Sequence, residues 1–169
     1  MDETLASGHV RCFGDDINTD YIVPSHRKKM SIDPDVLKRY IFEDIRDGFF
    51  ENLGERTILV AGKNFGCGSA MEIAVTVLQR AGVGAIIAQS FARTFKRNAI
   101  NNGLLLCEAS VGDVAEDSEA RIACGQQETV IHLGDCTLSC KPMPDFLLGI
   151  FREGGLIPYL LKHDGFKVA

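Results

Sequence analysis

One glycine-rich stretch decides the fold of this chain: Gly62-Lys63-Asn64-Phe65-Gly66-Cys67-Gly68-Ser69-Ala70-Met71-Glu72-Ile73-Ala74. The residues before it, 57–61, form an apolar, β-branched run that is typical of a buried strand. After it, apolar residues recur at helical spacing up to Ala81, and Gly82 is a suitable C-terminal stop. The signature stretch, residues 62–74, is therefore predicted to connect a strand to a helix.

Ser69 is the residue of this stretch with the clearest chemical potential. Gly66 and Gly68 permit backbone angles that other residues resist, and they allow a ligand to approach the main chain. We expect Ser69 at or near the first helical turn, where free N–H groups and the helix dipole favour an anion. A hydroxyl held there could act as a base, but an ordinary N-cap serine fits the same pattern.

Several common glycine motifs are excluded by spacing. No Lys-Ser/Thr pair follows the second glycine as a P-loop requires, and the third glycine of a dinucleotide fingerprint is missing. A Gly-x-Ser-x-Gly nucleophile elbow is also absent.

The signature stretch resembles the Gly-x-Asn-Phe-Gly-x-Gly-Ser-Ser-Arg-Glu-x-Ala motif of the aconitase and isopropylmalate isomerase family. Segments 14–24, 90–103 and 152–156 resemble, in the same order, the family's small swivelling domain, which is a separate subunit in the isopropylmalate enzymes. This resemblance implies one swivelling β/β/α domain over residues 1–169. Its fold class would be α/β, with a mainly parallel central sheet, flanking helices and a short antiparallel element.

The pattern of elements agrees with an α/β fold. Strands and helices alternate in the first two thirds of the chain, which implies parallel strands with right-handed crossovers. The expected strands there are 8–13, 57–61, 85–88 and 104–107, and the expected helices begin at Asp33-Pro34 or cover 72–81 and 91–101. Short antiparallel strands are expected at 121–124, 129–133 and 137–141, followed by two amphipathic helices that break at Gly154-Gly155.

Composition sets further limits. A chain of 169 residues, 46% of them hydrophobic, can bury one substantial core and is most simply one domain. Its net charge of −5 argues against a nucleic-acid partner. No apolar run approaches the roughly twenty residues of a membrane span, and the acidic start lacks the order of a signal peptide. A cytoplasmic location is expected by default.

The cysteines give no sign of a metal site. The chain contains Cys12, Cys67, Cys107, Cys124, Cys136 and Cys140, without a Cys-x-x-Cys pair. Cys136 and Cys140 are expected on one face of a strand, where buried thiols act as small hydrophobes. Cys67 lies in the glycine turn near a helix N-terminus, where a thiol pKa can fall.

Segment 25–30, expected to be a loop, carries a group of cations. Arg27 could grip a carboxylate through two parallel hydrogen bonds, and the family uses this segment for substrate selection. His26, Lys28 and Lys29 are expected to be exposed.

A second cationic group lies on the helix predicted after strand 85–88. Helical spacing places Arg93 on the same face as Lys96 and Arg97. Helix starts beyond the carboxyl ends of parallel strands commonly line a ligand crevice. Salt bridges on an outer face, or contacts to a partner, are an equal alternative.

The resemblance also implies a reaction. Enzymes of this family are hydro-lyases that remove water from di- or tricarboxylate hydroxy acids and often add it back one carbon away. A separate large subunit would carry a [4Fe-4S] cluster, in a heterodimer or heterotetramer, and this chain would hold no cofactor. Ser69 matches the serine that abstracts the proton beside a carboxylate, a role that backbone N–H donors would support.

Other site residues follow from the same resemblance. Substrate-binding positions would be Arg27, Gly68, Ala70, Met71 and Arg93. Loop-positioning residues would be Thr19, Asp20, Asn64, Gly66 and Cys67. Thr19 and Asp20 could act through side-chain-to-backbone bonds or could close an Asx-type turn.

One departure from the motif affects the substrate. Where the family reads Ser-Ser-Arg-Glu, this chain reads Ser69-Ala70-Met71-Glu72, so the arginine that clamps a carboxylate is missing. Arg27 or Arg93 could replace it, the pocket could accept a methyl group, or the chain could be a non-catalytic partner. An isopropylmalate dehydratase subunit of leucine biosynthesis is expected, with homoaconitase and 2,3-dimethylmalate-type dehydratase as alternatives.

Overall fold

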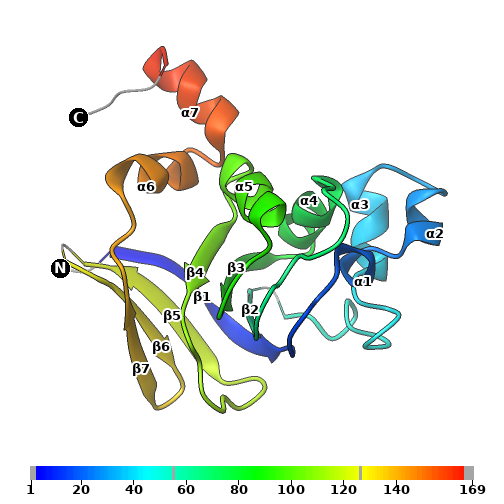
Figure 1. The fold of residues 1–169 in the computed structure, drawn as a ribbon, viewed down its shortest axis with the longest axis horizontal. Helices are drawn as coiled ribbons and strands as arrows, with labels where there is room; N and C mark the ends of the chain where they lie inside the picture. Colours follow the sequence, from blue (N-terminus) through cyan, green and yellow to red (C-terminus); the bar gives the residue numbers. More distant parts are fainter. Residues whose placement is uncertain (1–2, 55, 126, 166–169) are drawn as a thin grey trace.

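The computed structural model describes residues 3–54, 56–125 and 127–165, and within them one seven-stranded sheet has the order β4-β3-β2-β1-β5-β6-β7 (Figure 1). The strands are β1 (Glu3–Cys12), β2 (Thr57–Ala61), β3 (Val83–Ala88), β4 (Leu105–Glu108), β5 (Glu119–Cys124), β6 (Thr129–Leu133) and β7 (Cys136–Cys140). The helices are α1 (Thr19–Ile22), α2 (Ser25–Lys28), α3 (Pro34–Leu37), the 3-10 turn η1 (Lys38–Tyr40), α4 (Ile73–Arg80), α5 (Arg93–Asn101), α6 (Asp145–Arg152) and α7 (Leu156–His163).

Strand β1 joins two different halves of the sheet. It pairs in parallel with β2, and β2, β3 and β4 continue the parallel half. On its other side β1 pairs antiparallel with β5, followed by the antiparallel neighbours β6 and β7. The predicted α/β class is confirmed, and the carboxyl ends of β1, β2 and β3 lie at one edge of the sheet, where their loops can meet.

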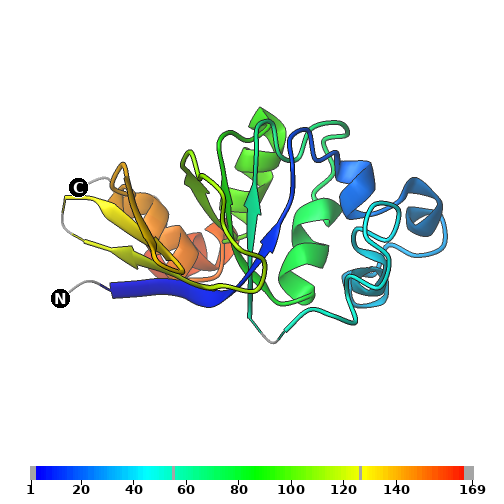
Figure 2. The ribbon, with the colours of Figure 1, turned by 90° about the horizontal axis from the view of Figure 1, so that it is seen from below.

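The core is divided between the two faces of the sheet. Every residue of β2 is buried, as the apolar, β-branched character of the run predicts. Alternation sends Leu59 into one cluster with Phe42, Phe65 and α4, and sends Ile58 into the other with β5 and β6 residues. Figures 1 and 2 show α1, α2 and α3 gathered beyond α4, away from the β5–β7 strands.

Some local expectations were wrong. Strand β1 begins at Glu3, five residues earlier than expected, because its polar first half is stabilised by pairing with β5. Segment 25–30 contains the single helical turn α2, which is too short to show a helical period. The capped start at Asp33 is confirmed, since its side chain accepts from the Asp35 N–H.

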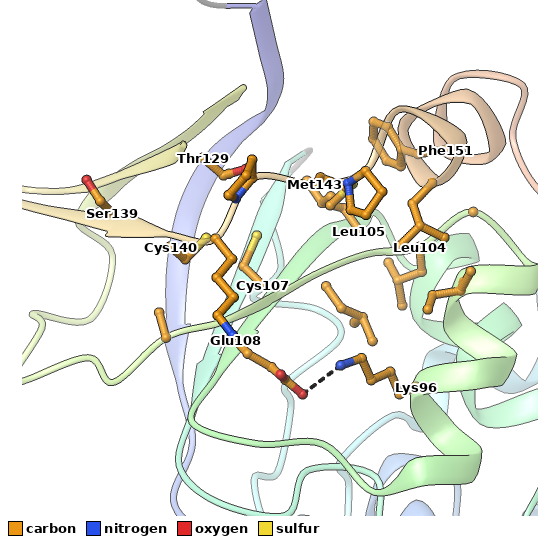
Figure 3. A pocket seen from close by; sticks show the side chains of 18 of the residues that line it. Lys96, Leu104, Leu105, Cys107, Glu108, Thr129, Ser139, Cys140, Met143 and Phe151 are labelled. Carbon is orange, nitrogen blue, oxygen red and sulfur yellow. Dashed lines mark hydrogen bonds and ion pairs between the residues drawn. The ribbon is translucent and has the colours of Figure 1, made fainter. Parts of the chain in front are cut away.

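The sheet is curled, so that its two outer strands line the same cavity. Strands β4 and β7 stand at opposite ends of the strand order, yet Cys140 packs against the apolar cluster that contains Cys107 (Figure 3). Both residues line a cavity of about 710 Å³ between these strands and α6. The expectation of two buried thiols on β7 holds in part, because Cys140 is half-buried but Cys136 is exposed.

The thiol pair makes a pH-dependent prediction. The neighbouring Cys107 thiol holds the pKa of Cys140 below its ordinary value, so alkylation of Cys140 by iodoacetamide should rise at a lower pH than that of an ordinary thiol. Cys107→Ala removes the neighbouring thiol and should move that rise toward the ordinary thiol pKa of about 8.5. Peptide-resolved mass spectrometry measures both profiles, with exposed Cys136 as an internal reference. Identical Cys140 profiles in the two proteins would contradict this account.

Candidate functional site

The loops that follow β1, β2 and β3 are joined into one layer by the signature stretch. Residues 65–67 bridge residues 17–19 on one side and residues 90–92 on the other. The Gly66 N–H donates to the Ile17 carbonyl oxygen at 2.7 Å, as in a strand ladder. The start of the stretch is thus held by backbone hydrogen bonds on both sides.

Two glycines of the stretch are required by contact as well as by conformation. Gly66 has φ +79°, and a Cβ there would lie 2.2 Å from the Phe95 ring. Gly68 has φ +96°, and its Cβ would lie 2.4 Å from the Asn18 side-chain oxygen. Any side chain at either position would displace a neighbour and strain the backbone. Asn64 also has a positive φ, of +59°.

Polar side chains of the first loop hold the turn further. The Asn64 side chain donates to the Asp16 carboxylate at 2.7 Å. The Thr19 hydroxyl donates to the Ser69 carbonyl at 3.1 Å, so Thr19 does bond the signature stretch. Asn18, which sequence reasoning passed over, caps α1 by accepting from the Asp20 N–H. An Asn before a short apolar turn is a recognisable capping signal that could have identified it.

Ser69 lies exposed at the tip of the turn, but ahead of the helix. It was expected at or near the first helical turn, but it lies outside the helix because α4 begins at Ile73. The Ser69 carbonyl already accepts from Thr19 and from the Met71 N–H at 2.8 Å, and is therefore committed to the turn. Within the described residues, the N–H groups of 68–70 donate to no protein acceptor, so they are available to an anion.

Cys67 is not an activated thiol. Burial raises its pKa, and the nearby Asp16 carboxylate raises it further. The expected lowering depended on a helix N-terminus, and α4 starts too far along the chain to supply one. Its carbonyl oxygen accepts from the Thr19 N–H at 2.8 Å, so Cys67 helps to position the turn through its backbone.

Arg27 is already bound within the protein. Its Nε and Nη2 atoms donate to the two Glu43 carboxylate oxygens at 2.7 and 3.0 Å, and its guanidinium lies 3.9 Å from the Tyr40 ring centre. His26 is exposed as expected, with its Nε2 atom 3.4 Å from the same carboxylate. These contacts fix α2 against residues 40–43.

Lys28 is the residue that departs most from expectation. Its side chain is only 11% exposed, whereas Lys29 is exposed. The ammonium donates to the Asp20 carboxylate at 2.6 Å and lies 3.3 Å from the Met71 sulfur. The Asp20 carboxylate also accepts from Ser25, and these bonds, with Lys28 first, lower the Asp20 pKa.

The second cationic group is dispersed. Arg93 is exposed at the start of α5 and forms no hydrogen bond or ion pair with the described residues. Lys96 pairs with Glu108 at 2.9 Å and lines the cavity between β4 and β7 (Figure 3). The three cations therefore do not converge on one ligand.

Over residues 3–54, 56–125 and 127–165, no three side chains among His, Cys, Asp and Glu come together as metal ligands. The same residues contain no helix with the length and apolar character needed to cross a bilayer.

Known proteins resemble this chain closely. A family model for the aconitase C-terminal domain matches residues 37–111. The 3-isopropylmalate dehydratase small subunit 2 of Methanopyrus kandleri is 42% identical over 159 residues, which cover 93% of this chain and 94% of that protein. The chain belongs to the 3-isopropylmalate dehydratase small-subunit family. The membership agrees with the resemblance found in segments 14–24, 62–74, 90–103 and 152–156.

Further members agree in fold as well as in sequence. A crystal structure of 3-isopropylmalate dehydratase (leuD) from Methanocaldococcus jannaschii superposes with a TM-score of 0.84 at 36% identity, covering 94% of this chain and 95% of that one. The methanogen homoaconitase small subunit of Methanothermobacter thermautotrophicus is 39% identical over 161 residues, covering 95% of this chain and 93% of that protein. A protein named as a homoaconitase subunit is therefore about as similar to this chain in sequence as the dehydratase subunits are.

Proposed function

We propose that this chain is the small subunit of a 3-isopropylmalate dehydratase, which isomerises isopropylmalate in leucine biosynthesis by removing and re-adding water. The observation that carries the proposal is the exposed Ser69 at the tip of a turn locked between the loops after β1 and β3. Relatives of about 40% identity over more than nine tenths of the chain support it. One domain over residues 1–169 and a cytoplasmic location complete the proposal, with neither nucleic acid nor membrane as partner.

Ser69, ionised to its alkoxide, would abstract the proton beside a substrate carboxylate and become a neutral hydroxyl. The N–H groups of residues 68–70 would stabilise the negative charge of the alkoxide. They are preorganised and have no protein acceptor within the described residues. Thr19 would hold the Ser69 carbonyl, while Asn64 and Gly66 would fix the turn behind it. A [4Fe-4S] cluster of the large subunit would supply an open iron position for the substrate hydroxyl. This chain offers no ligand set for that cluster among its described residues.

Assembly tests the function directly. The chain should be titrated anaerobically into its cluster-loaded large subunit while ultraviolet absorbance follows the unsaturated product of isopropylmalate. We expect activity to rise until the two subunits reach a fixed ratio, and neither subunit to be active alone. Activity of the large subunit that does not depend on this chain would overturn the proposal.

A homoaconitase is the second candidate, since the Methanothermobacter relative of that name is nearly as similar as the dehydratases. Met71, apolar where the motif has arginine, instead favours a substrate with an alkyl branch, such as isopropylmalate or dimethylmalate. Turnover of homocitrate in preference to both would select the homoaconitase.

Arg27 allows a prediction that separates positioning from direct contact. Arg27→Lys should raise KM about 3- to 10-fold, because an ammonium cannot bind both Glu43 oxygens and α2 would shift. Glu43→Gln should raise KM similarly if Arg27 positions α2. If Arg27 binds substrate itself, Glu43→Gln frees its guanidinium, and KM would stay level or fall. Steady-state kinetics of both variants in the assembled enzyme decides between the two roles.

A further inference from the structure

A largely buried cation, Lys28, lies beside the turn that carries Ser69, with its side chain 11% exposed. The Lys28 ammonium lies 3.3 Å from the Met71 sulfur, and the Met71 N–H bonds the Ser69 carbonyl at 2.8 Å. Thr19, next to the Asp20 that holds Lys28, bonds the same carbonyl. The cation and the candidate base are thus parts of one hydrogen-bonded unit.

A largely buried ammonium needs hydrogen-bond acceptors, and Lys28 has one N–H donor more than it has partners in the described part of the chain. The group carries three N–H donors. Among the described residues, one contacts the Asp20 carboxylate and one the Met71 thioether, which is a weak acceptor. An incoming carboxylate would therefore gain a strong donor without displacing Asp20.

The other candidate cations are less suitable. Arg27 is occupied by both oxygens of Glu43 and by the face of Tyr40. Arg93 is exposed on a different element and has no bond to the signature stretch among the described residues. Lys28 is the cation that contacts residue 71, where the family motif carries its arginine.

We propose that Lys28 binds a carboxylate of the substrate, supplying from α2 the positive charge that Met71 cannot. Asp20 positions the ammonium, and the thioether beside it leaves an apolar wall for an alkyl branch of the same substrate. This assignment rests on the proposed function, because it takes a small hydroxy acid with at least one carboxylate as the ligand.

Lys28→Met in the assembled enzyme tests the assignment. KM should rise about 10- to 100-fold, as expected for losing a hydrogen bond between charged groups, while kcat changes little. The variant should fold, because Asp20 is 49% exposed and remains hydrated, and a methionine can pack against Met71. Lys28→Arg should recover most of the affinity, and Lys29→Met, which alters an exposed neighbour, should match wild type.

A charge exchange makes the test specific to position. Because the Lys28 ammonium touches the Met71 side chain, Lys28→Met combined with Met71→Arg returns a cation to the same space. The double variant should restore KM to within about 5-fold of wild type. An unchanged KM in Lys28→Met, or no recovery in the double variant, would overturn the assignment.

Calorimetric binding of isopropylmalate to the assembled complex keeps this result distinct from failure of the proposed function. If wild type binds but does not turn over, the reaction assignment fails, and the ratio of dissociation constants for Lys28→Met and wild type still decides the role of Lys28. If wild type turns over and the ratio of dissociation constants is near one, only the role assigned to Lys28 is wrong. If wild type neither binds nor reacts, both are overturned.

Discussion

Ser69→Ala is expected to reduce kcat of the assembled dehydratase by about 10²- to 10⁴-fold, the range typical for loss of a general base. KM should change little, because the hydroxyl acts on the proton in the transition state and the proposed carboxylate contact lies at Lys28. The side chain is exposed and loses only its hydroxyl, so we expect the unfolding free energy to change by less than about 0.5 kcal/mol. Anaerobic steady-state kinetics measures the effect.

The matched control is Ser139→Ala, which removes an exposed hydroxyl from β7, far along the chain from the signature stretch. It should leave both kinetic constants unchanged. Equal activity of Ser69→Ala and Ser139→Ala would remove Ser69 from the mechanism and favour a non-catalytic partner subunit.

Gly66→Ala is expected to cause the largest loss of stability, about 2–5 kcal/mol. The positive φ accounts for part of this cost, and the collision of the new Cβ with the Phe95 ring, 2.2 Å away, accounts for the rest. Residues 65–67 would have to shift from both neighbouring loops, so the protein that remains folded should also be impaired in turnover. Urea denaturation followed by circular dichroism measures the stability.

Gly154→Ala separates the two contributions. Gly154 has φ +78°, almost the same as Gly66, but a Cβ there would meet nothing within 4 Å. Its cost should be about 1 kcal/mol, from backbone conformation alone. If both alanine variants lose the same stability, the contact between the signature stretch and α5 is not what requires the glycine.

The parallel half of the sheet could be predicted because its signals are local. The run 57–61 is apolar after Thr57, and β2 is buried at every position. The glycine turn and the helical spacing after it placed α4 to within a residue at each end. In such segments, neighbouring residues supply the physical cause of the structure.

The surroundings of the site could not be predicted, because they depend on distant contacts. Lys28 contacts Met71, 43 residues away in sequence, and no pattern within segment 25–30 shows this. From the sequence, Arg27 has no evident carboxylate partner, whereas in the structure it hydrogen-bonds Glu43. The contact of Cys107 with Cys140 likewise depends on the curl of the whole sheet, which strand order alone does not determine.

The start of α4 illustrates competition for a single carbonyl group. Ser69 precedes a helix in sequence, but its carbonyl accepts from Thr19 and Met71 and does not begin the helical ladder. This choice keeps the serine exposed and leaves the N–H groups of 68–70 without protein acceptors among the described residues. The same choice explains why the Cys67 pKa is raised, since no helix terminus lies close enough to oppose its burial.

The most direct test is the relative kcat/KM of the assembled, anaerobic enzyme for isopropylmalate, homocitrate, citrate and dimethylmalate, followed by absorbance of the unsaturated products. We predict a clear preference for isopropylmalate, which offers a carboxylate for Lys28 and an alkyl branch for Met71. Absence of turnover with all four acids, from a complex shown to contain its intact cluster, would contradict the account.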